Sequence, residues 1–241
     1  MEKAQAYRVF SDLHTHTLYS HGVGTPRQNV LAAIDKGLES ICVSEHGPGH
    51  FSFGVRGKKL ERLNAELTSL RGEFKDKIEV LCGLELNVMG FGASDCPANR
   101  DDYDVIILGY HKSVPPFNSH ARHIWAESLL GIAGDPHKNA EGILLAAEKC
   151  RANIISHPGL YLKVDIPYMA NCCRQLGILM EVNSSRVTMS RDELTTVRDA
   201  GCGLIIGSDA HSPERVGDFA LASTAVSEAG CWDAVINARP V

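Results

Sequence analysis

The sequence predicts an α/β protein built on a parallel sheet, and most simply a single α/β barrel. Short apolar runs alternate with longer segments of helical periodicity, which is typical of repeated βα units. The chain has 241 residues, which falls within the usual size of one such barrel. Hydrophobic residues make up 44% and charged residues 22%, enough for a large buried core, and this composition excludes disordered, collagenous and coiled-coil chains. We therefore expect one domain over residues 1–241.

Seven apolar runs are the candidate strands, at residues 8–13, 40–44, 78–86, 104–109, 152–156, 178–182 and 203–207. The first helix is well signalled, because Thr25 can cap it, Pro26 suits its first position and Gly37 can end it. Further helices are expected at residues 58–74, 139–151, 165–176, 189–200 and 215–229, with a short one near 119–131 inside the long segment 112–138. Residues 212–241 after the last run look helical, and an eighth strand is not found.

The composition also limits partners and compartment. The 24 basic and 29 acidic residues give a net charge of −5, which argues against extended nucleic acid as a partner. The eight cysteines form no CxxC pair, so neither a thiolate zinc site nor a redox pair is indicated. The N-terminus lacks an apolar signal region, and no stretch approaches 18 consecutive apolar residues. We expect a cytoplasmic protein that does not bind membranes, and the sequence leaves its oligomeric state open.

Every one of the seven runs ends in a residue that can bind a metal. The first ends in His14 and His16, which are two apart and so point to the same face of an extended segment. The later runs end in Glu45 and His46, Glu85, His111, His157, Glu181 and Asn183, and Asp209 and His211. Taken singly, each could merely cap a helix. In parallel barrels, however, the active site forms at the C-terminal ends of the strands, and so many converging groups would leave buried charges unpaired without a metal.

The number of candidates indicates more than one ion. A catalytic zinc takes about three protein ligands, whereas this set offers nine: His14, His16, His21, His46, Glu85, His111, His157, Asp209 and His211. Nine ligands would serve two ions generously, or three if Glu85 bridges. Mixed histidine and carboxylate ligation suits Zn, Mn or Fe.

The ordered motifs resemble those of the polymerase and histidinol phosphatase (PHP) family of metal-dependent phosphoesterases. They are DLHTH at 12–16, EHG at 45–47, GLE at 83–85, GYH at 109–111, SHPG at 156–159 and SDAH at 208–211. The resemblance implies a distorted, seven-stranded TIM-like (β/α)7 barrel with parallel strands. Such a barrel carries three divalent metal ions at the C-terminal ends of its strands, and it agrees with the missing eighth strand.

The resemblance also implies a ligand set for each ion. The first ion would be held by His14, His16, Glu85 and Asp209. The second would be held by Glu85, His111 and His157, and the third by His21, His46 and His211. His50, in the glycine-rich segment 47–57, could take the place of His21. Asp12 or Glu45 is expected to orient a metal-bound histidine.

The implied reaction is hydrolysis of a small phosphomonoester by a hydroxide that bridges two ions. Glu85 and Asp209 are the carboxylates expected at the catalytic centre. Arg186 is a candidate for binding the phosphate, and Arg215 and Lys112 are two further candidates. Histidinol phosphate or a nucleotide is the expected substrate. Two other functions remain open: an amidohydrolase-type metal hydrolase, and a non-catalytic PHP domain that supports a DNA polymerase or repair partner.

Overall fold

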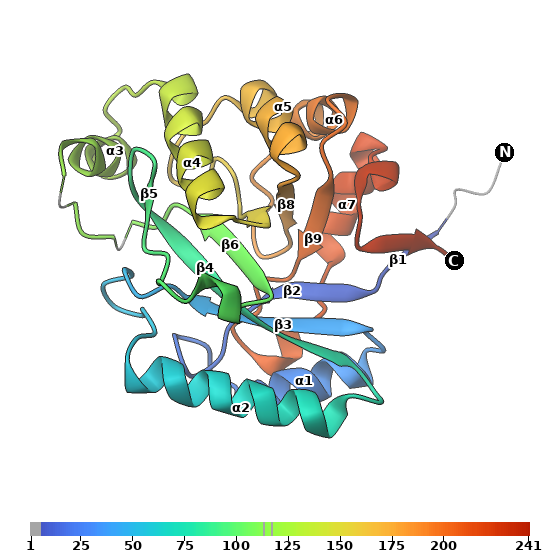
Figure 1. The fold of residues 1–241 in the computed structure, drawn as a ribbon. Coiled ribbons are helices and arrows are strands. Elements are labelled where there is room, and N and C mark those ends of the chain that lie inside the picture. Colours follow the sequence, from blue (N-terminus) through green and yellow to red (C-terminus); the bar gives the residue numbers. More distant parts are fainter. Residues whose placement is uncertain (1–5, 113, 117) are drawn as a thin grey trace, which may run out of the picture.

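Seven parallel strands curve into a barrel at the centre of the protein (Figure 1). The structure is a computed structural model that describes residues 6–112, 114–116 and 118–241. The barrel strands, each paired in parallel with the next, are β2 (Ser11–Thr15), β3 (Ser40–His46), β4 (Glu79–Gly90), β6 (Val105–Gly109), β7 (Ile154–Ile155), β8 (Leu179–Asn183) and β9 (Leu204–Gly207). The predicted fold class is confirmed, and each of the seven apolar runs contributes one barrel strand.

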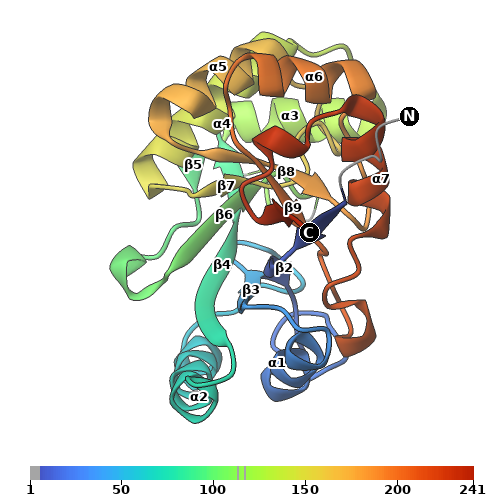
Figure 2. The same ribbon diagram turned by 90° about the vertical axis from the view of Figure 1, so that its right-hand side faces the viewer.

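Helices surround the barrel, with α1 and α2 on one side of the molecule and α4 to α7 on the other (Figures 1 and 2). The helices are α1 (Pro26–Asp35), α2 (Lys58–Phe74), α3 (Ser119–Leu130), α4 (Pro136–Cys150), α5 (Ile166–Leu176), α6 (Arg191–Asp199) and α7 (Ala220–Ala229). The expected start of α1 is confirmed, because the Thr25 hydroxyl accepts the N–H of Gln28 and the Gln28 side chain accepts that of Thr25. No helix in the described part of the chain is long and apolar enough to cross a membrane.

Three short strands and three single 3₁₀ turns complete the fold. The strands are β1 (Tyr7–Val9), β5 (Ala93–Ser94) and β10 (Ala238–Pro240), and the turns are η1 (Arg100–Asp102), η2 (Pro213–Arg215) and η3 (Trp232–Ala234). The first predicted strand, 8–13, is wrong in its bounds, because it is divided between two sheets. β1 pairs antiparallel with β10, and only β2 joins the barrel.

The prediction that residues 212–241 are helical is also wrong in part. The helix begins at Ala220 rather than at 215, and the chain ends in β10. Gly217 has a φ of 69°, a left-handed conformation that a right-handed helix does not contain, and its N–H donates to the Asp12 carboxylate at 2.8 Å. Elsewhere α4 begins three residues earlier than expected because Asp135 caps it, and β4 runs on to Gly90 and forms a hairpin with β5.

The C-terminal segment fills the place of the missing eighth strand. The buried Asn237 side chain lies between β9 and β2, where it accepts the N–H of Ile206 and donates to the carbonyls of Ile206 and Ser11. Further along, β2 and β9 close directly, since the His16 N–H donates to the Ala210 carbonyl at 2.7 Å. A polar side chain thus satisfies backbone groups that an eighth strand would otherwise pair.

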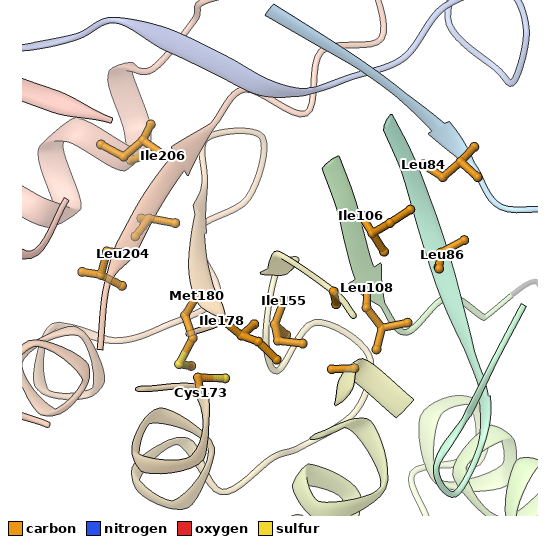
Figure 3. Close-up of a cluster of buried hydrophobic side chains, with 14 of the residues drawn as sticks. Leu84, Leu86, Ile106, Leu108, Ile155, Cys173, Ile178, Met180, Leu204 and Ile206 are labelled. Atoms are coloured by element: carbon orange, nitrogen blue, oxygen red, sulfur yellow. The ribbon is translucent and has the colours of Figure 1, made fainter. Parts of the chain in front are cut away.

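Two clusters of buried apolar side chains form the core, a large one and a smaller one. Figure 3 shows side chains of alternate strand positions packing toward the helices, among them Leu84, Leu86, Ile106, Leu108, Met180 and Leu204. The intervening positions point inward, and a smaller cluster of Cys42, Val105, Ile107, Ile154 and Ile205 fills the interior. Glu85 on β4 and Glu181 on β8 also occupy inward positions, since they pair with Ile107 and Ile205 of this interior cluster. The two-residue repeat of a strand therefore directs these carboxylates toward the barrel axis.

Candidate metal centre

Glu85 is the centre of the site. This carboxylate on β4 is 1% exposed and faces five imidazoles from four other segments. Its Oε1 lies 3.0 Å from His157 Nε2, 3.2 Å from His111 Nε2 and 3.4 Å from His14 Nε2. Its Oε2 lies 3.0 Å from His46 Nδ1 and 3.5 Å from His16 Nε2. The two oxygens therefore face different sets of histidines, as a bridging carboxylate does.

Donor spacing around His14 and His16 fits a metal ion. Ligand atoms about 2.0–2.2 Å from a tetrahedral ion stand roughly 3.3–3.5 Å from one another. The Nε2 atoms of His14 and His16 are 3.2 Å apart, and Asp209 Oδ1 lies 3.6 Å and 3.4 Å from them. With Glu85 these four donors form the set that the sequence predicts for the first ion.

Hydrogen bonds to Nδ1 leave the Nε2 lone pairs of three histidines free. His14 Nδ1 lies 2.7 Å from Glu181 Oε1, His111 Nδ1 lies 2.8 Å from Asn87 Oδ1, and His211 Nδ1 lies 2.9 Å from the Asp209 carbonyl. Each partner is an acceptor, so each Nδ1 carries a proton, and in the neutral ring Nε2 holds the lone pair that can bind a metal. His211 Nε2 is buried and lacks a hydrogen-bond partner within the described part of the chain. A bound cation would satisfy it.

His46 and His211 form a third cluster with His16. One nitrogen of each lies within 4.8 Å of the others. His21, the expected third ligand here, is exposed, with its ring stacked on that of His46 at 4.9 Å and centred 4.0 Å from that of His211. His50 is buried and stacks on His46 at 4.5 Å. The structure therefore brings both alternatives to this cluster.

The imidazoles of the site differ in how readily they take up a proton. Burial lowers the pKa of His46 and of His211. Partial desolvation of the His21 ring, together with His211 and His16, lowers its pKa to about 3. Burial also opposes protonation of His14 and His16, but the nearby carboxylates outweigh it, raising the pKa of His14 well above its usual value and that of His16 to about 9. A metal ion would replace protons at these last two residues.

Local backbone strain marks two of the expected ligands. His157 and Asp209 have φ values of 30° and 50°, which residues with a side chain seldom adopt. Glycines leave room beside His157 and beside Glu181. A Cβ on Gly109 would stand 2.9 Å from His157 Cε1, and one on Gly207 would stand 2.4 Å from Glu181 Oε1.

Three buried carboxylates surround the proposed ligands. Glu45 lies beside His16, with Oε2 3.7 Å from His16 Nδ1, and Asp12 accepts the backbone N–H groups of Ser208 and Gly217. The sequence marks Glu181 only as an acid at a strand end. It accepts from His14 through Oε1 and, through Oε2, from the His157 N–H at 3.0 Å and Asn183 at 3.1 Å. Its inward position on β8 is the signal by which the sequence could have assigned it this role.

The site opens into a cavity of about 240 Å³. Among the candidates for binding phosphate, Lys112 lines this cavity and Arg186 does not. Arg186 is exposed, although its N–H donates to Asn183 Oδ1, and Asn183 in turn donates to Asp209. Arg215 already pairs with Asp218 at 2.9 Å. The structure thus places one basic side chain of the three at the cavity.

The family model described as PHP domain matches residues 12–183, most of the barrel. This chain belongs to the PHP domain family. The match contains the DLHTH segment, the strands β4 and β8 that carry Glu85 and Glu181, and the loops that carry His111 and His157. The predicted resemblance is confirmed.

Curated relatives of this PHP domain carry the name of an enzyme. A protein named "Probable phosphatase" from Shewanella sediminis is 27% identical over 241 residues, covering 90% of this chain and 85% of the relative. "Probable phosphatase YcdX" from Escherichia coli is 26% identical over 226 residues, covering 86% and 81%. These relatives support the prediction of a phosphatase.

Solved structures confirm the fold. The histidinol phosphate phosphatase of Lactococcus lactis, complexed with zinc, L-histidinol and phosphate, superposes with a TM-score of 0.62 at 20% identity and covers 92% of this chain and 94% of its own. A putative histidinol phosphatase from Listeria monocytogenes gives a TM-score of 0.63 at 14% identity, with coverage of 86% and 97%. The barrel of this chain therefore has the fold of these two structures.

Proposed function

We propose that this PHP domain hydrolyses a small phosphomonoester at a centre of three divalent ions, Zn, Mn or Fe. The nine proposed ligands are His14, His16, His21, His46, Glu85, His111, His157, Asp209 and His211. The observation that carries the proposal is the buried Glu85 carboxylate, faced by five imidazoles beside an open cavity. Such a cluster has the donor types and spacing of a metal centre.

Bound divalent ions supply a hydroxide nucleophile near neutral pH and neutralise charge on a phosphate group. The chain's own residues prepare the site. Glu85 offers one oxygen to each side of the cluster, Glu181 holds the His14 ring and Asn87 holds the His111 ring, each with Nε2 turned toward the donors. These contacts place the ligands before any substrate arrives, which lowers the cost of reorganisation.

Two basic residues are the proposed partners of the phosphate oxygens. Lys112 lines the cavity, and its ammonium lies 4.7 Å from the centre of the Tyr161 ring. Arg186 is joined to the site through its backbone bond to Asn183. Lys112→Ala and Arg186→Ala test the two residues separately. An alanine variant that removes a phosphate contact should raise KM and weaken inhibition by inorganic phosphate at least tenfold, whereas a variant that removes no such contact should leave both quantities unchanged.

Histidinol phosphate is the first substrate to test, because the Lactococcus lactis neighbour holds L-histidinol and phosphate. Nucleotides are the second class. The cavity of about 240 Å³ accommodates a phosphate group and a small part of its leaving group rather than a long polymer. A shared fold does not by itself determine the substrate, so both classes are tested.

The test combines elemental analysis with release of inorganic phosphate from histidinol phosphate, nucleoside bisphosphates and short oligonucleotides. We expect three ions per chain, phosphate release from a small monoester, and loss of turnover on chelation. His111→Ala removes a proposed ligand, and His123→Ala, an exposed histidine on α3, is its matched control. Fewer than one ion per chain would refute the metal centre, and ammonia release without phosphate release would show an amidohydrolase instead. Bound metal without any turnover would indicate a non-catalytic domain.

A further inference from the structure

His50 is a cavity residue that the proposed ligand set does not use. It follows β3 and is 4% exposed, with its ring stacked on His46 at 4.5 Å and inclined by 20°. Its ring centre lies 5.7 Å from that of His111, and its side chain lines the cavity beside the cluster. His50 therefore stands where a bound phosphate group would meet it.

Two hydrogen bonds attach the segment that carries His50 to β4 and to Asp95, the residue after β5. The Gly47 N–H donates to the Glu85 carbonyl at 2.8 Å, and the Gly49 N–H donates to Asp95 Oδ2 at 2.7 Å. A Cβ on Gly49 would stand 2.7 Å from Asp95 Cβ, so the close approach requires glycine there. These contacts hold the backbone that leads into His50, and the stacking on His46 places its ring.

The hydrogen bond at Nδ1 fixes the tautomer of His50. The backbone N–H of Phe53 donates to His50 Nδ1 at 3.1 Å. A nitrogen that accepts an N–H carries no proton, so the proton of the neutral ring lies on Nε2. His14 and His111 show the opposite arrangement, because their Nδ1 atoms face acceptors and leave Nε2 as a lone pair. His50 thus presents a donor where the ligand histidines present lone pairs.

We propose that His50 binds the substrate, donating its Nε2–H to a phosphate oxygen, and is not a ligand of the third ion. A phosphate oxygen is an acceptor, and an N–H is its complement. The proposal rests on the proposed phosphatase function. It also resolves the alternative between His21 and His50 in favour of His21 as the third ligand beside His46 and His211.

Two variants distinguish the Nε2–H donor of His50 from the hydrogen bond that its Nδ1 accepts from the Phe53 N–H. In His50→Asn the side-chain oxygen keeps an acceptor near the former Nδ1 for the Phe53 N–H, but no N–H reaches the former Nε2 position. In His50→Gln the amide nitrogen reaches that position. His46→Ala, which removes a proposed ligand from the same cluster, serves as the comparison for metal loss.

The measurements are metal content by elemental analysis and the affinity of the metal-loaded protein for inorganic phosphate. We expect His50→Asn to keep the wild-type number of ions and to bind phosphate about 10- to 100-fold more weakly, as loss of a hydrogen bond to a charged group predicts. His50→Gln should recover most of this affinity, whereas His46→Ala should lose an ion.

Loss of an ion in His50→Asn, or wild-type phosphate affinity in that variant, would overturn the proposal for His50 while the metal centre stands. Wild-type protein that binds neither metal nor phosphate would overturn the proposed function, and the role of His50 with it.

Discussion

Glutamine at position 181 should damage the metal centre although Glu181 is not a proposed ligand. The Glu181 carboxylate accepts three N–H groups: His14 Nδ1–H on Oε1, and the His157 backbone and Asn183 amide on Oε2. A carboxylate has acceptors on both oxygens, but an amide has one acceptor and one donor. Glutamine therefore cannot satisfy all three groups in either orientation.

The two orientations fail in different ways. If the amide oxygen faces His14, the amide nitrogen opposes the other two donors, and two buried unpaired N–H groups cost about 2–6 kcal/mol together. If the amide nitrogen faces His14, the imidazole must accept at Nδ1 and carry its proton on Nε2, so that it no longer offers a lone pair to the first ion. Glu181 is 1% exposed, and water does not relieve either arrangement.

The assay is zinc affinity by competition with a chromophoric chelator, together with urea unfolding. We expect Glu181→Gln either to lower the affinity for the first ion about 10- to 100-fold or to lower the free energy of unfolding by several kcal/mol, depending on the orientation of the amide. Glu228→Gln, the same change at an exposed position of α7, should alter neither quantity. Wild-type zinc affinity together with wild-type stability in Glu181→Gln would refute the reasoning.

Three further outcomes are expected. Gly207→Ala should lower the free energy of unfolding in urea by about 1–3 kcal/mol, because its Cβ would stand 2.4 Å from Glu181 Oε1. Gly72→Ala, on the open surface of α2, should raise it by up to about 1 kcal/mol, and equal effects of the two changes would contradict this reasoning. Adding zinc to chelator-treated protein at pH 7.5 should release protons, because the raised pKa of His16, about 9, keeps it protonated until metal binds. The affinity for zinc should rise with pH up to about 9, and calorimetry in two buffers of different ionisation enthalpy should detect the proton release. Asp95→Asn should weaken the attachment of the segment that carries His50, since Asp95 accepts three N–H bonds from Asn87 and Gly49. The free energy of unfolding should fall by about 1–3 kcal/mol, and an unchanged value would show that these bonds are replaceable.

The barrel strands were predictable because their signal is local. An apolar run that ends in a polar ligand residue is visible in any extended segment, and its two-residue repeat places Glu85 on the inside. The start of α1 was predictable for the same reason, since Thr25 and Pro26 act on the adjacent turn. The division of residues 8–13 into two strands was not, because the partner of β1 is β10, more than 200 residues away.

The sequence by itself determined which residue types gather at the strand ends, and hence the fold class, the family and the candidate ligands. Tertiary structure decided how those side chains are used. The tautomers of His14, His111 and His50 depend on whether Nδ1 meets Glu181, Asn87 or the Phe53 N–H. A histidine looks the same in sequence whether it offers a lone pair or a proton, and only the neighbour that folding brings to its other nitrogen settles which it is.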